Sequence, residues 1–425
     1  MSLGLVCDEC DVYEAAEQAV AADKRYRMYV FWLGKVKRTE DADLAFRAHV
    51  ACIRAHDPHA NVTLVVQDSG WRKAARELSV IFSDARDIRL ITGELRVAYE
   101  RGWGVDWSVV RAHEKVVSPR TQRLHDAKWG VFNHFLGHDC KTAAEWNAKV
   151  ARFDVGRVAD QLEACGATFY FLTVMQGNRW MCAPSATYDS IAGTKPGEAC
   201  SVRDLPLELS AELEKRGMDL YLYFTGDGPC RDPEIGSRFG FAIDPDHLYA
   251  EVTEAFVRKW SSVLGDLARR YGNKVKGWWL DGCYDDMLGY TDELLGLYGE
   301  AVRAGNPAAL VSMNNGVFPY FRKHWSGEDF TAGEFNDFHC VPEKRFIEGA
   351  QAFVLAPLGA WRGDYCGWAS SGCKRSADYV AQYVQLVNAN GGVVCIDVKV
   401  SPDGAWEPDQ MEVLKAVGRA TGTLK

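Results

Sequence analysis

The sequence contains 425 residues, of which 47% are hydrophobic and 25% are charged, and its formal net charge at pH 7 is -9. This composition is typical of a soluble globular protein with a large core, and the negative balance argues against a nucleic-acid partner or an anionic membrane surface. No apolar run approaches the roughly 18 residues that a membrane span requires.

The N-terminal stretch MSLGLVCDECDVYE is acidic and lacks the apolar core of a secretory signal, so we expect a cytoplasmic protein. The 13 cysteines are scattered and odd in number, which favours reduced thiols. Cys7 and Cys10 form a C-x-x-C pair, but no second pair follows at the spacing of a zinc finger. We therefore expect no metal and no other cofactor, and the sequence leaves the oligomeric state open.

The first part of the chain differs from the rest. Residues 26–34 and 62–66 are predicted strands, and residues 41–57 between them form a predicted helix. These elements predict a small α/β domain of unknown role over residues 1–115. Residues 108–123 are a plausible linker into the second domain.

From residue 129 onward, apolar stretches alternate with amphipathic ones. The apolar stretches predict seven strands, at 129–135, 168–174, 219–226, 275–282, 309–315, 351–359 and 393–400. The amphipathic stretches predict helices at 155–166, 205–217, 247–272, 291–305 and 376–392.

This alternation predicts βα units around a parallel sheet, because the strands are apolar on both faces. The length fits an α/β fold of the (β/α)8 TIM-like barrel type over residues 116–425. A doubly wound sheet is the alternative. No glycine-rich phosphate loop follows the strand at 129–135, which weakens a nucleotide-binding interpretation.

Polar side chains gather at the C-terminal ends of the predicted strands, where barrel enzymes carry out their chemistry. His134, Gln176 and Tyr223 follow or end the first three strands, and Asp281 ends the fourth. Two carboxylates at such a mouth permit glycoside hydrolysis, because one can attack or activate water while the other protonates the leaving oxygen. The alternative for Asp281 is the first position of an Asp-Gly turn.

Tryptophans are frequent, with 14 in the chain, and flat rings can stack on sugars. Trp180 and Trp361 are candidates for such stacking, with core packing as the alternative for each. Trp278 and Trp279 are neighbours on the strand that ends at Asp281, so they should face opposite sides of the sheet. One should pack toward the helices and the other toward the barrel interior.

Several motifs stand in a definite order between about residues 125 and 420. They are HDAKWGVFNHFL (125–136), FDVGRVADQLEACGATFYFLTV (153–174), RDLPLELSAELEKRGMDLYLYFTG (203–226), WWLDG (278–282), MNNGVFPYF followed by EDFTAGEF (313–335), and VVCIDVKVSPDGAW (393–406). As an ordered set, they resemble the barrel of the α-L-fucosidases of glycoside hydrolase family 29.

The resemblance implies roles for three residues. Asp281 takes the place of the nucleophile in the W-x-D-G strand, and Glu334 takes the place of the acid/base of some members. His134 takes a position that binds a sugar hydroxyl. A retaining exo-glycoside hydrolase acting on a carbohydrate is the function that this implies.

The sequence also departs from the family pattern. Fucosidases carry adjacent histidines in a K-H-H-D-G-F segment, and MQGNRW stands here instead, so Gln176 and Gly177 replace them. Phe135 replaces a tryptophan, the arginine of the N-D-R motif is absent, and no β-sandwich follows the barrel. These departures predict weak activity on α-L-fucosides and a different sugar preference.

Two other hypotheses remain open. A carbohydrate-binding barrel that has lost its hydrolase activity would also explain the missing histidines and arginine. An unrelated barrel enzyme, such as a metal-dependent hydrolase, is the third possibility, although His134, His138 and His339 lack the H-E-x-x-H spacing.

Overall fold

The computed structural model describes residues 5–7, 28–34, 61–66, 119–243, 251–318, 321–342, 344–361 and 366–424. The chain divides into two compact units near residue 110, and the segments 319–321 and 339–343 group with the first unit. The domain boundary expected at residue 115 stays a prediction, because residues 67–118 lie outside the described part.

The smaller unit contains a parallel three-stranded sheet in the order β1-β2-β3. Its strands are β1 (Leu5–Cys7), β2 (Met28–Gly34) and β3 (Asn61–Val66). The strands predicted at 26–34 and 62–66 are therefore confirmed. The helix predicted at 41–57, the Cys10 of the C-x-x-C pair and the linker up to residue 118 lie outside the described residues.

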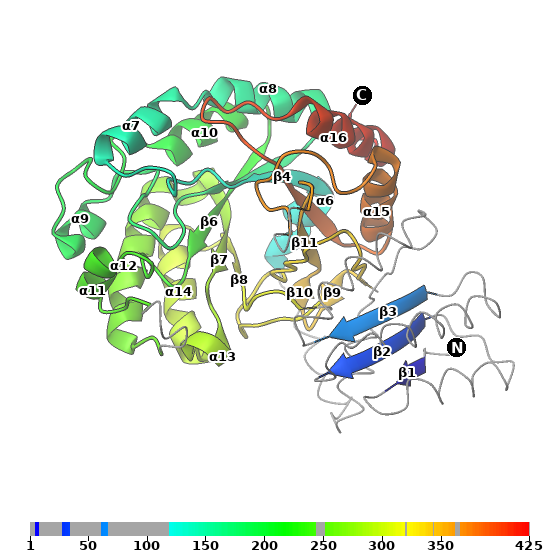
Figure 1. Cartoon of the computed structure of the whole chain (residues 1–425), viewed down its shortest axis with the longest axis horizontal. Helices are drawn as coiled ribbons and strands as arrows, with labels where there is room; N and C mark the ends of the chain where they lie inside the picture. Colours follow the sequence, from blue (N-terminus) through cyan, green and yellow to red (C-terminus); the bar gives the residue numbers. More distant parts are fainter. Residues whose placement is uncertain are drawn as a thin grey trace, which may run out of the picture. The chain divides into compact units, whose positions relative to one another are not determined.

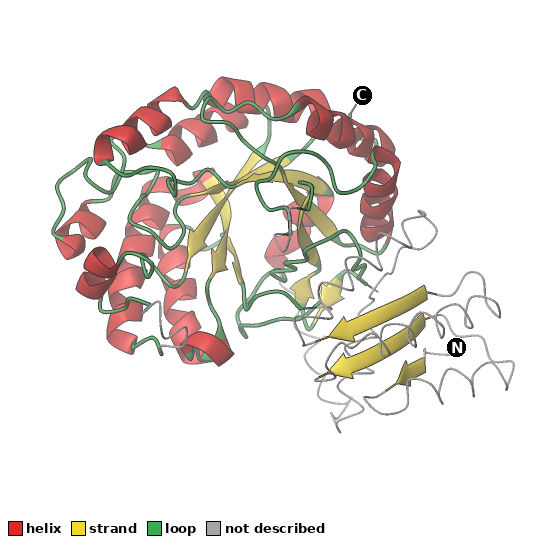
Figure 2. Ribbon diagram, in the orientation of Figure 1, coloured by secondary structure: helices red, strands yellow, loops and turns green. Residues whose placement is uncertain are grey.

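The larger unit is built on a curled, seven-stranded parallel sheet, and all seven strands predicted for it form (Figure 2). Their order across the sheet is β11-β12-β4-β5-β6-β7-β8. The strands are β4 (Trp129–Asn133), β5 (Phe169–Thr173), β6 (Asp219–Thr225), β7 (Val275–Asp281), β8 (Leu310–Met313), β11 (Phe353–Pro357) and β12 (Val393–Asp397). A two-stranded antiparallel hairpin of β9 (Phe346–Ile347) and β10 (Ala350–Gln351) precedes β11.

Helices cover the outer face of this sheet (Figure 1). Those expected are α8 (Val155–Cys165), α10 (Leu205–Glu214), α12 (Glu254–Tyr271), α14 (Asp292–Gly305) and α15 (Ala377–Ala389). The unit also contains helices that were not predicted, namely η2 (Pro119–Thr121), α6 (Gln122–Ala127), α7 (Ala143–Arg152), α9 (Ala186–Ala192), α11 (Pro233–Phe239), η3 (Gly272–Lys274), α13 (Asp285–Leu288) and α16 (Pro408–Thr421).

Local capping explains several helix ends. Thr142 and Glu145 form a reciprocal capping box at the start of α7. The helix predicted from residue 247 begins as α12 only at Glu254, because the side chain of Thr253 accepts a hydrogen bond from the Phe256 backbone and caps the helix there. Gly166 ends α8 in the left-handed conformation, with φ of 79°.

The place of an eighth strand is taken by an irregular segment, residues 329–335. Its Asp329 N–H donates to Val311 O of β8 at 2.9 Å, and Leu355 of β11 exchanges backbone hydrogen bonds with Phe335 and Gly333 at 3.0 and 2.8 Å. The Thr331 hydroxyl, rather than a backbone group, accepts a hydrogen bond from the Phe353 N–H at 3.0 Å and donates one to the Phe353 carbonyl oxygen at 3.1 Å. The side chain thus replaces part of the ladder, so seven regular strands form where the barrel expectation required eight.

The two tryptophans before Asp281 face opposite sides, as predicted. Trp278 packs toward the helices, against Tyr271 of α12 and against Phe224, with ring centroids 6.4 and 6.2 Å apart. Trp279 belongs to the interior cluster and stacks on Tyr223 at 5.4 Å. Its indole N–H donates to Ala332 O at 3.0 Å, which ties β7 to the irregular segment. The strand that carries Asp281 is therefore held on both faces.

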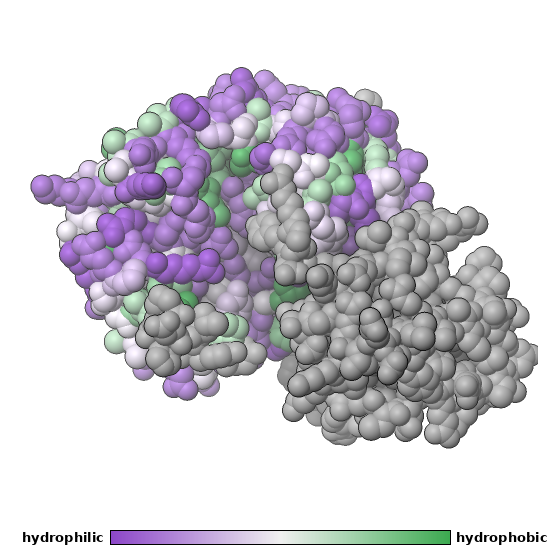
Figure 3. All heavy atoms as spheres, viewed as in Figure 1, coloured by the Kyte–Doolittle hydropathy of each residue, from purple (hydrophilic) through white to green (hydrophobic). Residues whose placement is uncertain are grey.

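The outer surface over the helices is largely hydrophilic on the face in Figure 3, with scattered apolar residues. In the part of the chain that the structure describes, no helix is both long and apolar enough to cross a membrane.

Candidate active site

Asp281 is the last residue of β7, and donors at the ends of three other strands hold its carboxylate. The Tyr223 hydroxyl of β6 donates to Asp281 Oδ2 at 2.5 Å. The Gln176 side-chain amide, in the loop after β5, approaches the same oxygen at 3.4 Å. The Asn314 amide, directly after β8, donates to Asp281 Oδ1 at 2.8 Å. These contacts place Asp281 at the C-terminal mouth of the sheet, as predicted.

Glu334 lies beside Asp281 even though the two are 53 positions apart in the chain. The same nitrogen of Asn314 that donates to Asp281 also donates to Glu334 Oε2, at 2.6 Å. Asp281 Oδ1 and Glu334 Oε2 are therefore separated by no more than the sum of these two hydrogen-bond lengths. That limit falls within the separation of about 5–5.5 Å that is typical of retaining glycosidases.

Burial and the neighbouring charge make Glu334 a poor anion. Burial is the first cause and the charge of Asp281 the second, and together they raise the pKa of Glu334 to about 8, against a smaller lowering by the hydrogen bond from Asn314. Glu334 therefore holds its proton near neutral pH. An ionised carboxylate beside a protonated carboxylic acid is the pair that retaining hydrolysis uses.

Two tyrosines flank the nucleophile candidate. Burial, and then the charge of Asp281, raise the pKa of Tyr223 well above its ordinary value, so its hydroxyl remains a neutral donor. Tyr284, in the loop after β7, has a pKa that is raised first by the charge of Asp281, then by burial and then by Glu334. Tyr284 is therefore close enough to both carboxyl groups for their charges to act on it, and sequence analysis did not identify it as a site residue.

His134 lies at the same mouth, after β4. Its Nδ1 is 2.8 Å from Asp397 Oδ1 at the end of β12, and Asp397 Oδ2 accepts the Ala369 N–H at 2.7 Å. The imidazole packs edge-on against Trp368 at 5.6 Å and Tyr223 at 6.1 Å between ring centroids. Because Asp397 orients Nδ1, the other ring nitrogen is the one available to a ligand.

The structure brings together Asp281, Glu334, Tyr223 and Gln176, with His134 reaching this group through Tyr223. The two predicted stacking residues, Trp180 and Trp361, make other contacts, and a role in stacking on a sugar stays a prediction for both. Trp180 donates its indole N–H to Cys140 O at 3.1 Å and packs against Trp146, with centroids 6.4 Å apart. Trp361 lies under the ammonium group of Lys374, at 4.3 Å from the ring centroid.

Asn314 is the residue with two carboxylate contacts to which sequence reasoning gave no role. The available signal was its position, since a polar pair, Asn314 and Asn315, ends a predicted strand. The second asparagine holds the neighbouring loop, because Asn315 Oδ1 accepts the backbone N–H of Asp285 at 3.0 Å.

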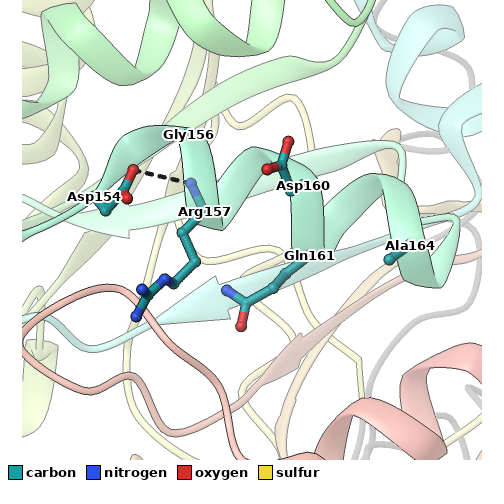
Figure 4. Close-up of a pocket in the computed structure, with 6 residues that line it drawn as sticks. All are labelled: Asp154, Gly156, Arg157, Asp160, Gln161 and Ala164. Atoms are coloured by element: carbon teal, nitrogen blue, oxygen red, sulfur yellow. Dashed lines mark hydrogen bonds between the residues drawn. The ribbon is translucent and has the colours of Figure 1, made fainter.

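A separate depression of about 470 Å³ lies on the outside of the larger unit, along α8 (Figure 4). It is lined by Asp154, Gly156, Arg157, Asp160, Gln161 and Ala164. Its Gln161 side chain already bonds Gly404 O and the Trp406 N–H, so the polar groups there hold the C-terminal loop. This depression contains none of the strand-end residues.

No group of three or more histidine, cysteine, aspartate or glutamate side chains suited to a metal ion occurs among the described residues. The site residues themselves are carboxyl, amide, phenol and imidazole groups, which can carry out acid/base and nucleophilic chemistry.

Comparison with known proteins identifies a matching family. The sequence model of a family described as Alpha-L-fucosidase matches residues 96–422. No curated protein matches the sequence.

Solved structures resemble the fold. An endo-fucoidan hydrolase of glycoside hydrolase family 107 is 14% identical with a TM-score of 0.55, over 70% of this chain and 63% of that one. A second endo-fucoidan hydrolase of that family is 13% identical with a TM-score of 0.54, over 70% of this chain and 53% of that one. An alpha-L-fucosidase from Bacteroides thetaiotaomicron is 16% identical with a TM-score of 0.51, over 72% of this chain and 74% of that one. The chain thus spans less than two thirds of each of these endo-fucoidan hydrolases.

Proposed function

This chain belongs to the alpha-L-fucosidase family, and from that premise we propose that it is a retaining exo-glycoside hydrolase with an altered sugar preference. One observation carries the proposal most strongly. Asp281 and Glu334 share one amide donor, and burial with the neighbouring charge keeps the second of them protonated.

In the first step, a carboxylate oxygen of Asp281 attacks the anomeric carbon while the bond from that carbon to the leaving oxygen breaks. Glu334 gives its proton to the leaving oxygen, so the aglycone departs as a neutral alcohol. The product is an ester between the sugar and Asp281. Ionised Glu334 then takes a proton from water, whose oxygen attacks the same carbon and restores free Asp281 and protonated Glu334.

The hydrogen bonds around Asp281 fit this role. Tyr223, Gln176 and Asn314 all donate to its carboxylate and hold it in place for attack. The short separation from Glu334 leaves no room for a water between the carboxylates and the sugar, which favours a covalent intermediate over direct attack by water.

The altered preference rests on the loop after β5. Where fucosidases place two histidines, Gln176 turns its amide toward Asp281, and Gly177 has no side chain. A Cβ at position 177 would lie 3.0 Å from Cδ of Arg231, so the stem of Arg231 lies in the space that a second imidazole would need. A site without two side chains that hydrogen-bond the sugar hydroxyls should bind fucose weakly, since an unpaired buried polar group costs about 1–3 kcal/mol.

The test is a panel of aryl glycosides, with kcat/KM measured for the α-L-fucoside beside other glycones. We expect hydrolysis of at least one glycoside, with the α-L-fucoside a poor substrate. Asp281→Asn should abolish turnover, whereas Asp292→Asn, which changes an exposed carboxylate at the start of α14, should leave it unchanged.

Two results would contradict parts of the proposal. Efficient cleavage of the α-L-fucoside alone would remove the altered preference. Sugar binding without hydrolysis of any glycoside would reject the hydrolase and favour a carbohydrate-binding protein without hydrolase activity.

A further inference from the structure

One nitrogen atom joins the two carboxyl groups of the site. Asn314 Nδ2 carries two hydrogens, and it donates one bond to Asp281 Oδ1 at 2.8 Å and one to Glu334 Oε2 at 2.6 Å. The amide oxygen accepts the backbone N–H of Gly316 at 3.2 Å. That third bond favours the amide orientation in which the nitrogen, and not the oxygen, faces the carboxyl groups.

The backbone of Asn314 is held just as firmly. Its N–H donates to Leu280 O of β7 at 2.7 Å, and its carbonyl accepts the Cys283 N–H at 3.1 Å. These bonds lie on either side of Asp281 in the chain. Asn314 is therefore fixed relative to the segment that carries Asp281 by three hydrogen bonds, to Leu280, Asp281 and Cys283.

We infer that Asn314 is a positioning residue that fixes the separation of Asp281 and Glu334 and leaves the acid proton on Glu334 Oε1. This inference rests on the proposed function. Oε2 accepts an N–H at a short distance, so a proton on that oxygen would compete with the Asn314 donor. The other oxygen can carry the proton at no such cost, and it is the oxygen from which transfer to a leaving group would occur.

The same hydrogen bond acts on the acidity of Glu334. Donation to Oε2 favours the ionised form and lowers the pKa, whereas burial and the charge of Asp281 raise it. The charge of Glu334 also acts on Tyr284, whose raised pKa keeps it a neutral phenol. Removing the Asn314 donor should therefore raise the pKa of Glu334 further.

The experiment uses the full chain with Asn314→Ala and Asn314→Leu, the second of which fills the space without a donor. Glu334 is followed by carbon NMR of protein labelled at the glutamate carboxyl carbon, with its signal identified by its loss in Glu334→Gln. In both Asn314 variants, we expect the Glu334 titration and the alkaline limb of kcat/KM to move to higher pH. We expect kcat/KM at pH 7 to fall by about 10- to 100-fold, the effect of losing one hydrogen bond to a charged group.

Asn306→Ala is the matched control. Asn306 also makes two hydrogen bonds, to Val275 O at 3.3 Å and from the Ala308 N–H at 3.0 Å, but it lies by the first residue of β7 rather than the last. Its loss should lower the melting temperature without moving the Glu334 titration.

The outcomes separate the inference from the proposed function. A Glu334 titration that stays in place, or moves to lower pH, in both Asn314 variants overturns the inference, whatever the activity. Full activity of Asp281→Asn and Glu334→Gln would instead overturn the proposed function.

Discussion

The pH dependence of catalysis follows from the environment of Glu334. An ordinary glutamate has a pKa of about 4.5, so at pH 7 only about one molecule in 300 would hold the acid proton. With the pKa raised to about 8, about nine molecules in ten hold it at pH 7. Burial and the charge of Asp281 thus keep most of the enzyme in the acid form at neutral pH, where an ordinary glutamate would be almost fully ionised.

We therefore expect kcat/KM on the best glycoside to be level near pH 7 and to fall about tenfold per pH unit above about pH 8. Asp281→Asn removes the charge that raises this pKa, so the Glu334 titration should move to lower pH in that inactive variant when followed by carbon NMR. A plateau extending beyond pH 10, or an alkaline limb that persists unchanged in Glu334→Gln, would refute the assignment of this limb to Glu334.

Three further predictions concern the surroundings of the site. Tyr223→Phe removes the hydroxyl that donates to Asp281 and should lower kcat by about 10- to 100-fold, with a near-normal melting temperature; an unchanged kcat would contradict this. Trp278→Ala removes a buried ring between β7 and α12, and chemical denaturation should show a loss of about 3–5 kcal/mol; a loss below about 1 kcal/mol would refute the packing argument. Burial raises the pKa of Glu328 to about 8, so the native protein keeps this proton while the unfolded chain releases it above about pH 4.5. Stability should therefore fall as pH rises from about 4.5 to 8, and Glu328→Gln should flatten that fall; an identical pH profile in the variant would contradict the assignment.

The regular strands were predictable because strands of a parallel sheet are buried on both faces and read as continuous apolar runs. The irregular segment at 329–335 was not, since its Thr331 side chain takes over backbone partners of β11 and no apolar periodicity marks that exchange. Several helices, such as α7 and α16, were missed although local signals mark their starts, a capping box of Thr142 and Glu145 for α7 and a proline in the first turn of α16.

The site was predictable in part. Asp281 could be found from its place at the end of an apolar strand, whereas Glu334 was identified through the resemblance to a family. The hydrogen bonds from Asn314 to both residues form because β8 lies beside β7 in the folded sheet. No spacing in the sequence predicts that contact. Trp180 was expected to bind the sugar because it lies in a loop after a strand end, but the sequence does not reveal that its ring packs against Trp146 of α7.

The most direct test of the central claim is to trap the covalent intermediate. The protein would be incubated with a set of activated 2-deoxy-2-fluoro glycosides, whose fluorine slows release of the sugar, and then digested for peptide mass spectrometry. The account predicts one added sugar on the peptide that contains Asp281, and no addition in Asp281→Asn. Hydrolysis of the parent glycoside with the added sugar on another residue, or with no adduct from any reagent of the set, would contradict it.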